Sequence, residues 1–239
     1  MQVIRKSKLK KFQVLIVLLL CVFIIGILVQ IIYKENLNKS DANEKIDWND
    51  YELMYFDGLR YGFGEQGQAA VLHMPENIKK NNESFQIYGM SAFTSNLISV
   101  NRSIPDFRAK ECLKIKYLKN LPSVSIIIIF NNEVFSVFKR TLHSLYNRTP
   151  HKLIKEVILV NDFSTYDFLY DPLKIYVDEN FKNVEFKFIN LVKRSGLMKA
   201  RTLGARAATS DYLFVMEPHC ELTYNWLPPL IGNIINFIY

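Results

Sequence analysis

The chain has 239 residues and a formal net charge of +7 at pH 7, and 49% of its residues are hydrophobic. This length is enough for a domain with its own core. The positive charge does not indicate a nucleic-acid partner, because five basic residues lie together before residue 12: Arg5, Lys6, Lys8, Lys10 and Lys11. With only three cysteines, the chain also lacks the pattern of a small disulfide-rich protein.

A long apolar segment follows these basic residues. Every residue from Val14 to Val29 is apolar or small, and the next four residues bring the segment close to the ~20 residues that a spanning helix needs. A cleavable signal peptide usually has a shorter apolar region, and no small-x-small cleavage site precedes Lys34. We therefore expect a signal-anchor at 12–33. The basic residues favour a cytosolic tail at 1–11 and a lumenal remainder, which makes the protein a single-pass type II membrane protein.

The expected lumenal part contains four N-x-S/T triplets, which begin at Asn38, Asn82, Asn101 and Asn147 and are usable in a lumenal orientation where the asparagine is exposed. Asn82, Asn101 and Asn147 are our candidates for N-glycosylation. Chance occurrence in an asparagine-rich chain is the alternative. We expect some of these sites, and not all, to carry a glycan.

The region before residue 122 is predicted to have two parts. Residues 34–55 are mostly polar without a sustained apolar period, which is typical of a stem. Residues 56–121 form an amino-terminal extension of the catalytic region. The closely spaced glycines between Gly62 and Gly67 favour a loop over a phosphate-binding cradle, because their spacing matches neither a P-loop nor a dinucleotide fingerprint.

From residue 122 onward, apolar strands alternate with amphipathic helices. Residues 124–130 form an almost unbroken β-branched run, typical of a strand that is covered on both faces. Further strands are predicted at 157–160, 184–191 and 212–216, with helices around 135–145, 169–177 and 196–208. This alternation indicates an α/β fold with a parallel sheet and right-handed crossovers.

Polar clusters follow three of the predicted strands: Asn161-Asp162, Lys193-Arg194-Ser195-Gly196, and Glu217-x-His219. In open parallel sheets the ligand lies beyond the carboxyl ends of the strands, so we expect these clusters to converge on one edge. The aspartate suits a base or ribose, the arginine suits phosphate oxygens, and a carboxylate two positions from an imidazole suits a divalent cation. The alternatives are that Asp162 and Ser164 only cap a helix, and that Arg194 and the Glu217-x-His219 pair are solvated loop residues.

The chain resembles the polypeptide N-acetylgalactosaminyltransferases, Golgi type II enzymes that begin mucin-type O-glycosylation. The resemblance runs from about Gly62 to Leu230. Its motifs are Gly62-x-Gly64-Glu65-x-Gly67, Asn101-Arg102-Ser103-Ile104-Pro105-Asp106, Phe130-Asn131-Asn132-Glu133, Leu159-Val160-Asn161-Asp162-Phe163-Ser164, Arg194-Ser195-Gly196-Leu197, Ala200-Arg201 and Trp226-Leu227-x-Pro229-Leu230.

This resemblance implies a GT-A type fold, a Golgi membrane location with a lumenal catalytic part, UDP-N-acetylgalactosamine as donor, Ser/Thr hydroxyls of proteins as acceptors, and Mn2+ as cofactor. It places donor contacts at Asp162, Arg194, Asn131 and Gly196, and the metal at Glu217 and His219.

The chain also departs from the family pattern. Glu217 stands where the family has an aspartate, Asn131 stands where it usually has a histidine, and Asn161 replaces the first of two usual aspartates. The sequence ends at Tyr239, before the rest of the family's catalytic domain, so we expect an incomplete GT-A domain at 122–239. The alternative to an active transferase is a catalytically silent membrane-anchored homologue or truncated form that binds donor weakly or associates with a full-length relative.

Overall fold

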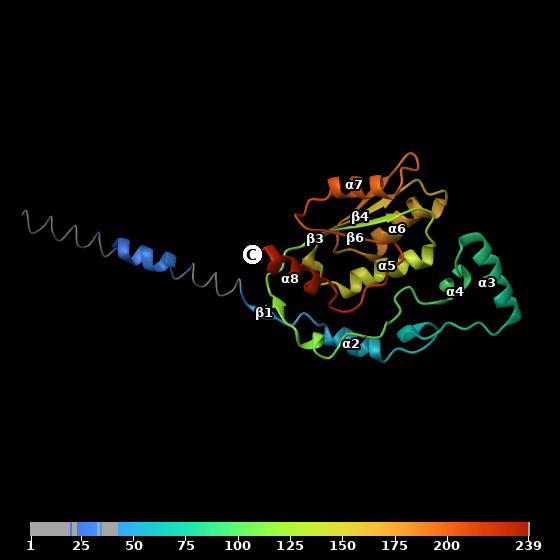
Figure 1. Ribbon diagram of the computed structural model, residues 1–239, viewed down its shortest axis with the longest axis horizontal. Helices are drawn as coiled ribbons and strands as arrows, with labels where there is room; N and C mark the ends of the chain where they lie inside the picture. The colour runs from blue at the N-terminus through green and yellow to red at the C-terminus, as the bar shows by residue number, and fades with distance from the viewer. Residues whose placement is uncertain (1–19, 21–22, 33, 35–42, 239) are drawn as a thin grey trace, which may run out of the picture. The chain divides into compact units, whose positions relative to one another are not determined.

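The computed structural model describes residues 20, 23–32, 34 and 43–238 (Figure 1). Residues 23–32 are helical, but much of the expected anchor at 12–33 and all of the tail at 1–11 lie outside the described residues. In the part of the chain that is described, no helix is both long enough and apolar enough to cross a membrane. The chain divides into two compact units, residues 1–46 with 118–120, and residues 47–117 with 121–239.

The smaller unit contains strand β1 (Lys45–Ile46). Contacts between Glu44 and Lys119 help to join its two parts, which are far apart in the sequence. The backbone N–H of Lys119 donates to the carbonyl of Glu44 at 2.8 Å, and Lys119 Nζ lies 2.7 Å from Glu44 Oε2.

The larger unit is built around a four-stranded parallel sheet with the order β5-β4-β3-β6. Its strands are β3 (Val124–Phe130), β4 (Ile154–Asn161), β5 (Phe186–Asn190) and β6 (Leu213–Met216). Ile127 of β3 aligns with Ile158 of β4 on one side and Val215 of β6 on the other. The predicted parallel α/β sheet is therefore confirmed, with β6 beginning one residue later than expected.

Strand β3 lies between β4 and β6, and all seven of its side chains are buried. Alternate residues face opposite sides of a strand. Ile127 and Ile129 pack with Ala200 on one face, whereas the ring of Phe130 packs on the ring of Phe138 at 4.8 Å on the other. Burial of each large aliphatic side chain contributes about 1.5–3 kcal/mol.

Helices cover both faces of the sheet. Helix α5 (Phe135–Arg148) lies on one face and α7 (Leu197–Ala207) on the other (Figure 1). Helix α7 sits very close to the strands, since a Cβ at Gly204 would lie 2.5 Å from Ile127 Cγ2. Next to α5 is α6 (Asp171–Asn180), whose Tyr176 contacts the rings of α5. Helix α8 (Leu227–Ile238) follows the β6 strand.

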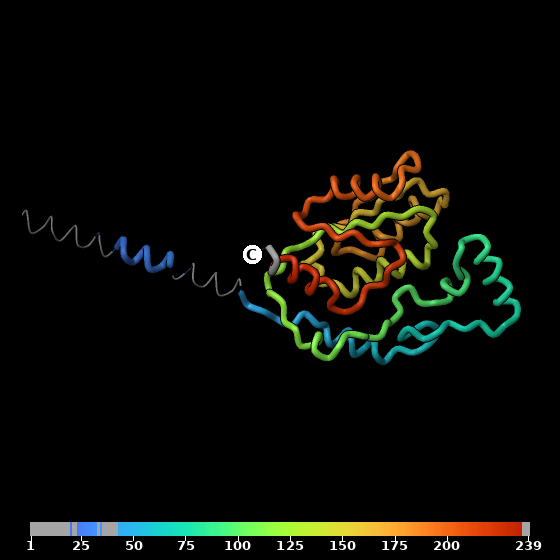
Figure 2. Tube along the Cα trace, in the orientation of Figure 1, coloured from blue at the N-terminus to red at the C-terminus, as the bar shows by residue number. Residues whose placement is uncertain are grey.

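Residues 47–117 run along one side of the same unit (Figure 2). Their helices are α2 (Tyr51–Gly58), α3 (Pro75–Tyr88) and α4 (Ala92–Leu97), and strand β2 (Tyr117–Leu118) follows. The expected boundary at residue 56 falls inside α2. Trp48 is already buried, and Asp50 caps α2 by accepting from the Leu53 N–H at 2.9 Å, so ordered structure begins within the segment that we expected to be a stem.

The described residues also contain four short 3-10 turns: η1 (Glu65–Gly67), η2 (Cys112–Lys114), η3 (His151–Leu153) and η4 (Asp167–Leu169). Leu169, which we expected at the start of a helix, belongs to η4 instead. Helix α6 begins at Asp171 because Pro172 occupies its first turn, where the fixed φ of proline favours a helix start.

Candidate donor and metal site

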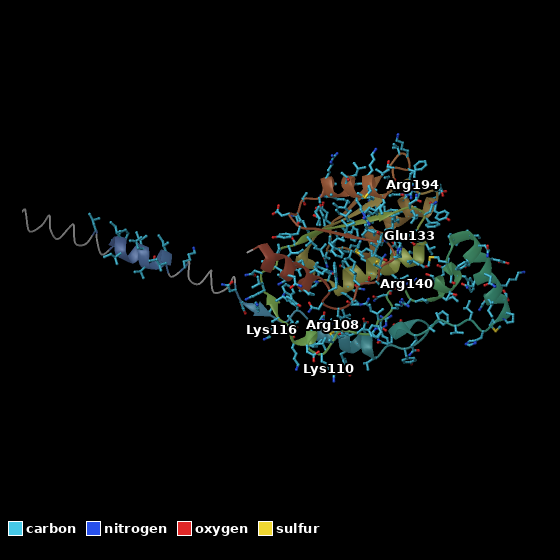
Figure 3. The ribbon with its side chains drawn as sticks, in the orientation of Figure 1. Arg108, Lys110, Lys116, Glu133, Arg140 and Arg194 are labelled. Carbon is cyan, nitrogen blue, oxygen red and sulfur yellow. The ribbon has the colours of Figure 1, made fainter. Side chains whose placement is uncertain are left out.

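A cavity of about 260 Å3 lies at the carboxyl ends of β3, β4 and β6. Most of the predicted site residues line it: Asn131, Asp162, Arg194, Glu217 and His219. The predicted convergence of the three polar clusters is thus confirmed. Glu133 and Leu197 also line the cavity, and Figure 3 shows Glu133 and Arg194 at the same end of the sheet.

Asp162 is almost fully buried, and its carboxylate holds the turn between β5 and α7. Its Oδ1 accepts from the Ser195 N–H at 2.7 Å, and its Oδ2 accepts from the Gly196 N–H at 2.9 Å. Gly196 has a φ of +84°, a conformation that glycine adopts without the steric penalty of a Cβ. Gly196 itself is not among the lining residues, so its link to the cavity runs through Asp162.

Arg194 is anchored to the same carboxylate. Its Nη1 lies 2.9 Å from Asp162 Oδ2, while 58% of the side chain is exposed. A guanidinium presents five N–H donors in a rigid fork. The arrangement therefore fixes one arm of the fork and leaves the group accessible from the cavity, which differs from a freely solvated arginine.

Asp162 does not cap a helix, because the next helical elements, η4 and α6, begin at Asp167 and Asp171 without a side-chain cap. Asn161 Oδ1 accepts from the Ser164 N–H at 2.9 Å, and this contact closes the turn after β4. Asn131 ties the end of β3 to the same turn, because its Nδ2 donates to the carbonyls of Asp162 and Phe163 at 2.9 and 3.1 Å. Both asparagines thus shape the wall of the cavity through hydrogen bonds to backbone groups.

Glu217 and His219 both face the cavity, and each has a polar partner. Glu217 Oε1 accepts from Arg201 Nη2 at 2.9 Å, and His219 Nδ1 lies 3.1 Å from Glu133 Oε2. Among the residues that the structure describes, no group of three or more His, Cys, Asp or Glu side chains is arranged around a common metal position. The protein therefore offers a carboxylate and an imidazole here as its two candidate ligands.

Glu133 is a site residue that the sequence reasoning missed. It follows Asn131 and Asn132 directly after the first strand of the sheet, and that position was the available signal. Its side chain is largely buried and accepts from the Val134 N–H at 3.1 Å, so the carboxylate is held in place beside His219. Glu133 is thereby able to orient the His219 ring.

The candidate glycosylation residues lie away from this cavity. Asn82, on α3, is exposed, as are Asn101 and Asn147. Asn147 Nδ2 donates to Asn101 Oδ1 at 2.8 Å, so these two asparagines contact each other. Glycosylation of these three asparagines remains a prediction.

Comparison with known proteins identifies the relatives of this chain. Residues 125–236 match the model of the family described as Glycosyl transferase family 2. The chain is 45% identical over 195 residues to N-acetylgalactosaminyltransferase 6 of Drosophila melanogaster, which covers 82% of this chain and 29% of the relative. It is 39% identical over 201 residues to human polypeptide N-acetylgalactosaminyltransferase 10, which covers 84% of this chain and 32% of the relative.

The fold has a solved counterpart in the crystal structure of GalNAc-T7 with UDP, GalNAc and Mn2+. The TM-score is 0.67 at 34% identity, over 74% of this chain and 32% of that one. The chain thus spans about a third of the length of the relatives that it matches. These similarities agree with the parallel sheet, and they show a GT-A glycosyltransferase fold. Over the part that matches, the chain belongs to the polypeptide N-acetylgalactosaminyltransferase family.

Proposed function

We propose that this protein acts in the transfer of N-acetylgalactosamine from UDP-N-acetylgalactosamine to Ser and Thr hydroxyls of proteins, the first step of mucin-type O-glycosylation. The observation that carries the proposal is the cavity in which the Asp162–Arg194 pair lies together with Glu217 and His219. The named relatives are transferases, and they give no support to the alternative of a catalytically silent homologue.

Arg194 is the residue that we assign to the phosphate groups of the donor. Its exposed guanidinium is held by Asp162, so little side-chain ordering is needed when an anion binds. The Asp162 carboxylate already accepts two backbone N–H groups as well as Arg194. Its contribution to donor binding is therefore to fix both Arg194 and the Gly196 turn at the edge of the cavity.

The chemistry of Glu217 and His219 fits Mn2+. Carboxylate oxygens suit Mn2+, and a metal-ligating histidine commonly donates its other ring N–H to a carboxylate. The contact between His219 Nδ1 and Glu133 Oε2 has this form and leaves Nε2 as the ligand atom. When bound, the cation would neutralise charge on the leaving diphosphate. Glu217 would supply an oxygen after yielding part of its contact with Arg201.

We also propose that the protein is a single-pass type II protein of the Golgi membrane with its catalytic part in the lumen. The support is the sequence, where the apolar segment from Val14 to Val29 follows the basic residues that favour the cytosolic side.

The proposed function is tested with the full chain purified in detergent. Titration calorimetry with UDP-N-acetylgalactosamine is expected to show binding that requires Mn2+ and is lost in Arg194→Ala. A radiolabelled donor with a Ser/Thr peptide then measures transfer. Donor binding that is insensitive to both Mn2+ and Arg194→Ala, or no labelled peptide, would contradict the proposal. Exposed Arg206→Ala, on α7 outside the cavity, is the matched control.

A further inference from the structure

The segment Glu217–Leu222, here called the site loop, is tied down along its length by α5. The Thr141 hydroxyl donates to the carbonyl of Pro218 at 2.8 Å in a buried position. The Leu222 N–H donates to Ser144 Oγ at 3.0 Å, and Arg148 Nη1 donates to the Leu222 carbonyl at 3.1 Å. The loop that carries Glu217 and His219 is therefore held against the helix at Pro218 and Leu222, while the His219 side chain is 56% exposed.

The same loop has an anchor from a distant part of the sequence. Glu221 is bound in fork geometry by Arg102, with Nε to Oε2 and Nη2 to Oε1 both at 2.8 Å. The two side chains are only 24% and 19% exposed. Arg140 adds a second cation, its Nε lying 3.5 Å from Glu221 Oε1. Charge-assisted pairs of this bidentate kind are the strongest and the most restrictive in geometry.

Arg102 is itself held by contacts with α5 and with the glycine-rich segment. Its carbonyl accepts from Arg148 Nη2 at 2.7 Å, and its Nη1 donates to the Gly64 carbonyl at 3.3 Å. The next residue, Ser103, is fully buried and donates from both N and Oγ to Glu65 Oε2 at 2.6 and 2.7 Å. The glycine-rich segment around Gly64 thus serves to seat Arg102.

We propose that Arg102, acting through Glu221, is a positioning residue for the metal ligands Glu217 and His219. Glu221 is two residues from His219, so fixing its carboxylate fixes the backbone that presents the imidazole to the cavity. A ligand pair on a held loop binds a cation without first ordering the chain, which raises affinity. This inference rests on the proposed function, because it assumes that the two residues bind the cation.

The test compares two arginines with similar surroundings. Arg102→Lys keeps the charge and removes the fork, since an ammonium cannot bind a carboxylate in that geometry. Arg108→Lys is the matched control: Arg108 pairs with Asp106 through contacts of 2.9 and 2.7 Å, and the two side chains are 19% and 18% exposed. Arg108 also donates to Asn49 and Met54, and Figure 3 labels Arg108 and Glu133 in different parts of the unit.

Three measurements are made on the full chain in detergent. The first is the dissociation constant of Mn2+ in the presence of UDP, from the electron paramagnetic resonance signal of free Mn2+. The second is hydrogen–deuterium exchange of the site-loop amides, and the third is the melting temperature without metal. Glu221→Gln, which keeps the size of the side chain and weakens the pair, is a second variant for the case in which Arg102→Lys folds poorly.

For Arg102→Lys we expect Mn2+ binding about tenfold weaker and faster exchange in the site loop, the size typical of residues that orient metal ligands. Glu221→Gln is expected to shift both in the same direction, and Arg108→Lys is expected to leave both unchanged even where it lowers the melting temperature equally. Wild-type binding and exchange in Arg102→Lys, or equal effects in Arg108→Lys, would overturn the inference alone. A wild-type chain that binds no Mn2+ with UDP would overturn the proposed function and the inference together.

Discussion

Glu133 Oε2 lies 3.1 Å from His219 Nδ1, although the two residues are 86 positions apart in the sequence. The contact joins the end of β3 to the site loop after β6. It fixes which ring nitrogen of His219 faces the carboxylate and which one is left for a cation.

His219→Ala is therefore expected to weaken Mn2+ binding, measured in the presence of UDP, by at least about tenfold. The exposed His73, which lies outside the cavity, provides His73→Ala as a control with no expected effect. If His219→Ala binds Mn2+ as tightly as wild type, His219 is a loop residue and the metal assignment is wrong.

Arg201→Met is expected to have the opposite effect on Mn2+. The guanidinium lies 2.9 Å from Glu217, and the two side chains are 40% and 44% exposed. An ion pair this exposed contributes about 0.2–1 kcal/mol, so its removal should strengthen Mn2+ binding by roughly 1.5- to fivefold. The same titration measures it, with Arg206→Met on the exposed side of α7 as control. Weaker binding in Arg201→Met would show that Glu217 depends on Arg201 for its position.

Glu156→Gln is expected to change how stability depends on pH. Burial alone disfavours the charged form of Glu156, but hydrogen bonds from Lys187, Ser125 and Thr209 outweigh it and lower the pKa from 4.5 to about 2. A carboxyl with a depressed folded-state pKa stabilises the fold above its unfolded pKa and loses that contribution as the pH falls through the folded value. The loss should fall between about pH 5 and pH 2 and amount to on the order of 1–3 kcal/mol.

Urea unfolding of the wild type and Glu156→Gln at several pH values measures this. The wild type should lose its advantage over the variant as the pH approaches 2. Glu185→Gln is the control, because Glu185 is 62% exposed and its Oε1 lies 3.8 Å from the same Lys187. A constant difference in the free energy of unfolding between wild type and Glu156→Gln across this pH range would contradict the lowered pKa of Glu156.

Gly204→Ala is expected to destabilise the protein by about 1–3 kcal/mol, although alanine is the better helix former. A Cβ at this position would lie 2.5 Å from Ile127 Cγ2 and 3.1 Å from Val160 Cγ2, both on buried strands. Thermal unfolding measures the effect. Gly58→Ala, where a Cβ has no neighbour within 4 Å, is the control. Equal melting temperatures for the two variants would mean that α7 moves away without cost.

Asn82 is the sequon that we expect to carry a glycan, given the proposed lumenal location. It is exposed on α3, whereas Asn101 and Asn147 are hydrogen-bonded to each other. Digestion with a peptide N-glycosidase should increase the electrophoretic mobility of protein from secretory cells, and Asn82→Gln should remove that change in part or whole. Asn180→Gln, outside any sequon, is the control. A wild-type chain that does not respond to the glycosidase would contradict the lumenal location.

The sheet and the convergence of its polar clusters were predictable because they depend on local patterns. Apart from Ser125, the run from Val124 to Phe130 is apolar on both faces, which is typical of a central strand. Since the carboxyl ends of parallel strands lie at one edge of the sheet, the residues that follow the strands lie close together there, whichever side-chain contacts they make. Helix starts were less predictable, as α6 shows, because a proline can move the boundary past an apolar residue such as Leu169.

The pairing of charged side chains was not predictable in the same way. Asp162 accepts hydrogen bonds from the backbone N–H groups of Ser195 and Gly196. Arg102 binds Glu221, which is 119 positions away in the sequence. Neither residue spacing nor secondary-structure propensity predicts these contacts, because they depend on how α5 and the segment 47–117 pack. The contact that the glutamate at position 217 makes was likewise not predictable from the sequence. In the structure the Glu217 carboxylate accepts a hydrogen bond from Arg201.

Strand β6 lies at one edge of the sheet, paired on one side with β3, and its Leu213 and Val215 side chains are 46% and 41% exposed. An edge of this kind offers a row of backbone donors and acceptors to any extended polypeptide. Because Glu217 and His219 follow β6 directly, a polypeptide that paired with this edge would lie next to the two residues that we propose as metal ligands.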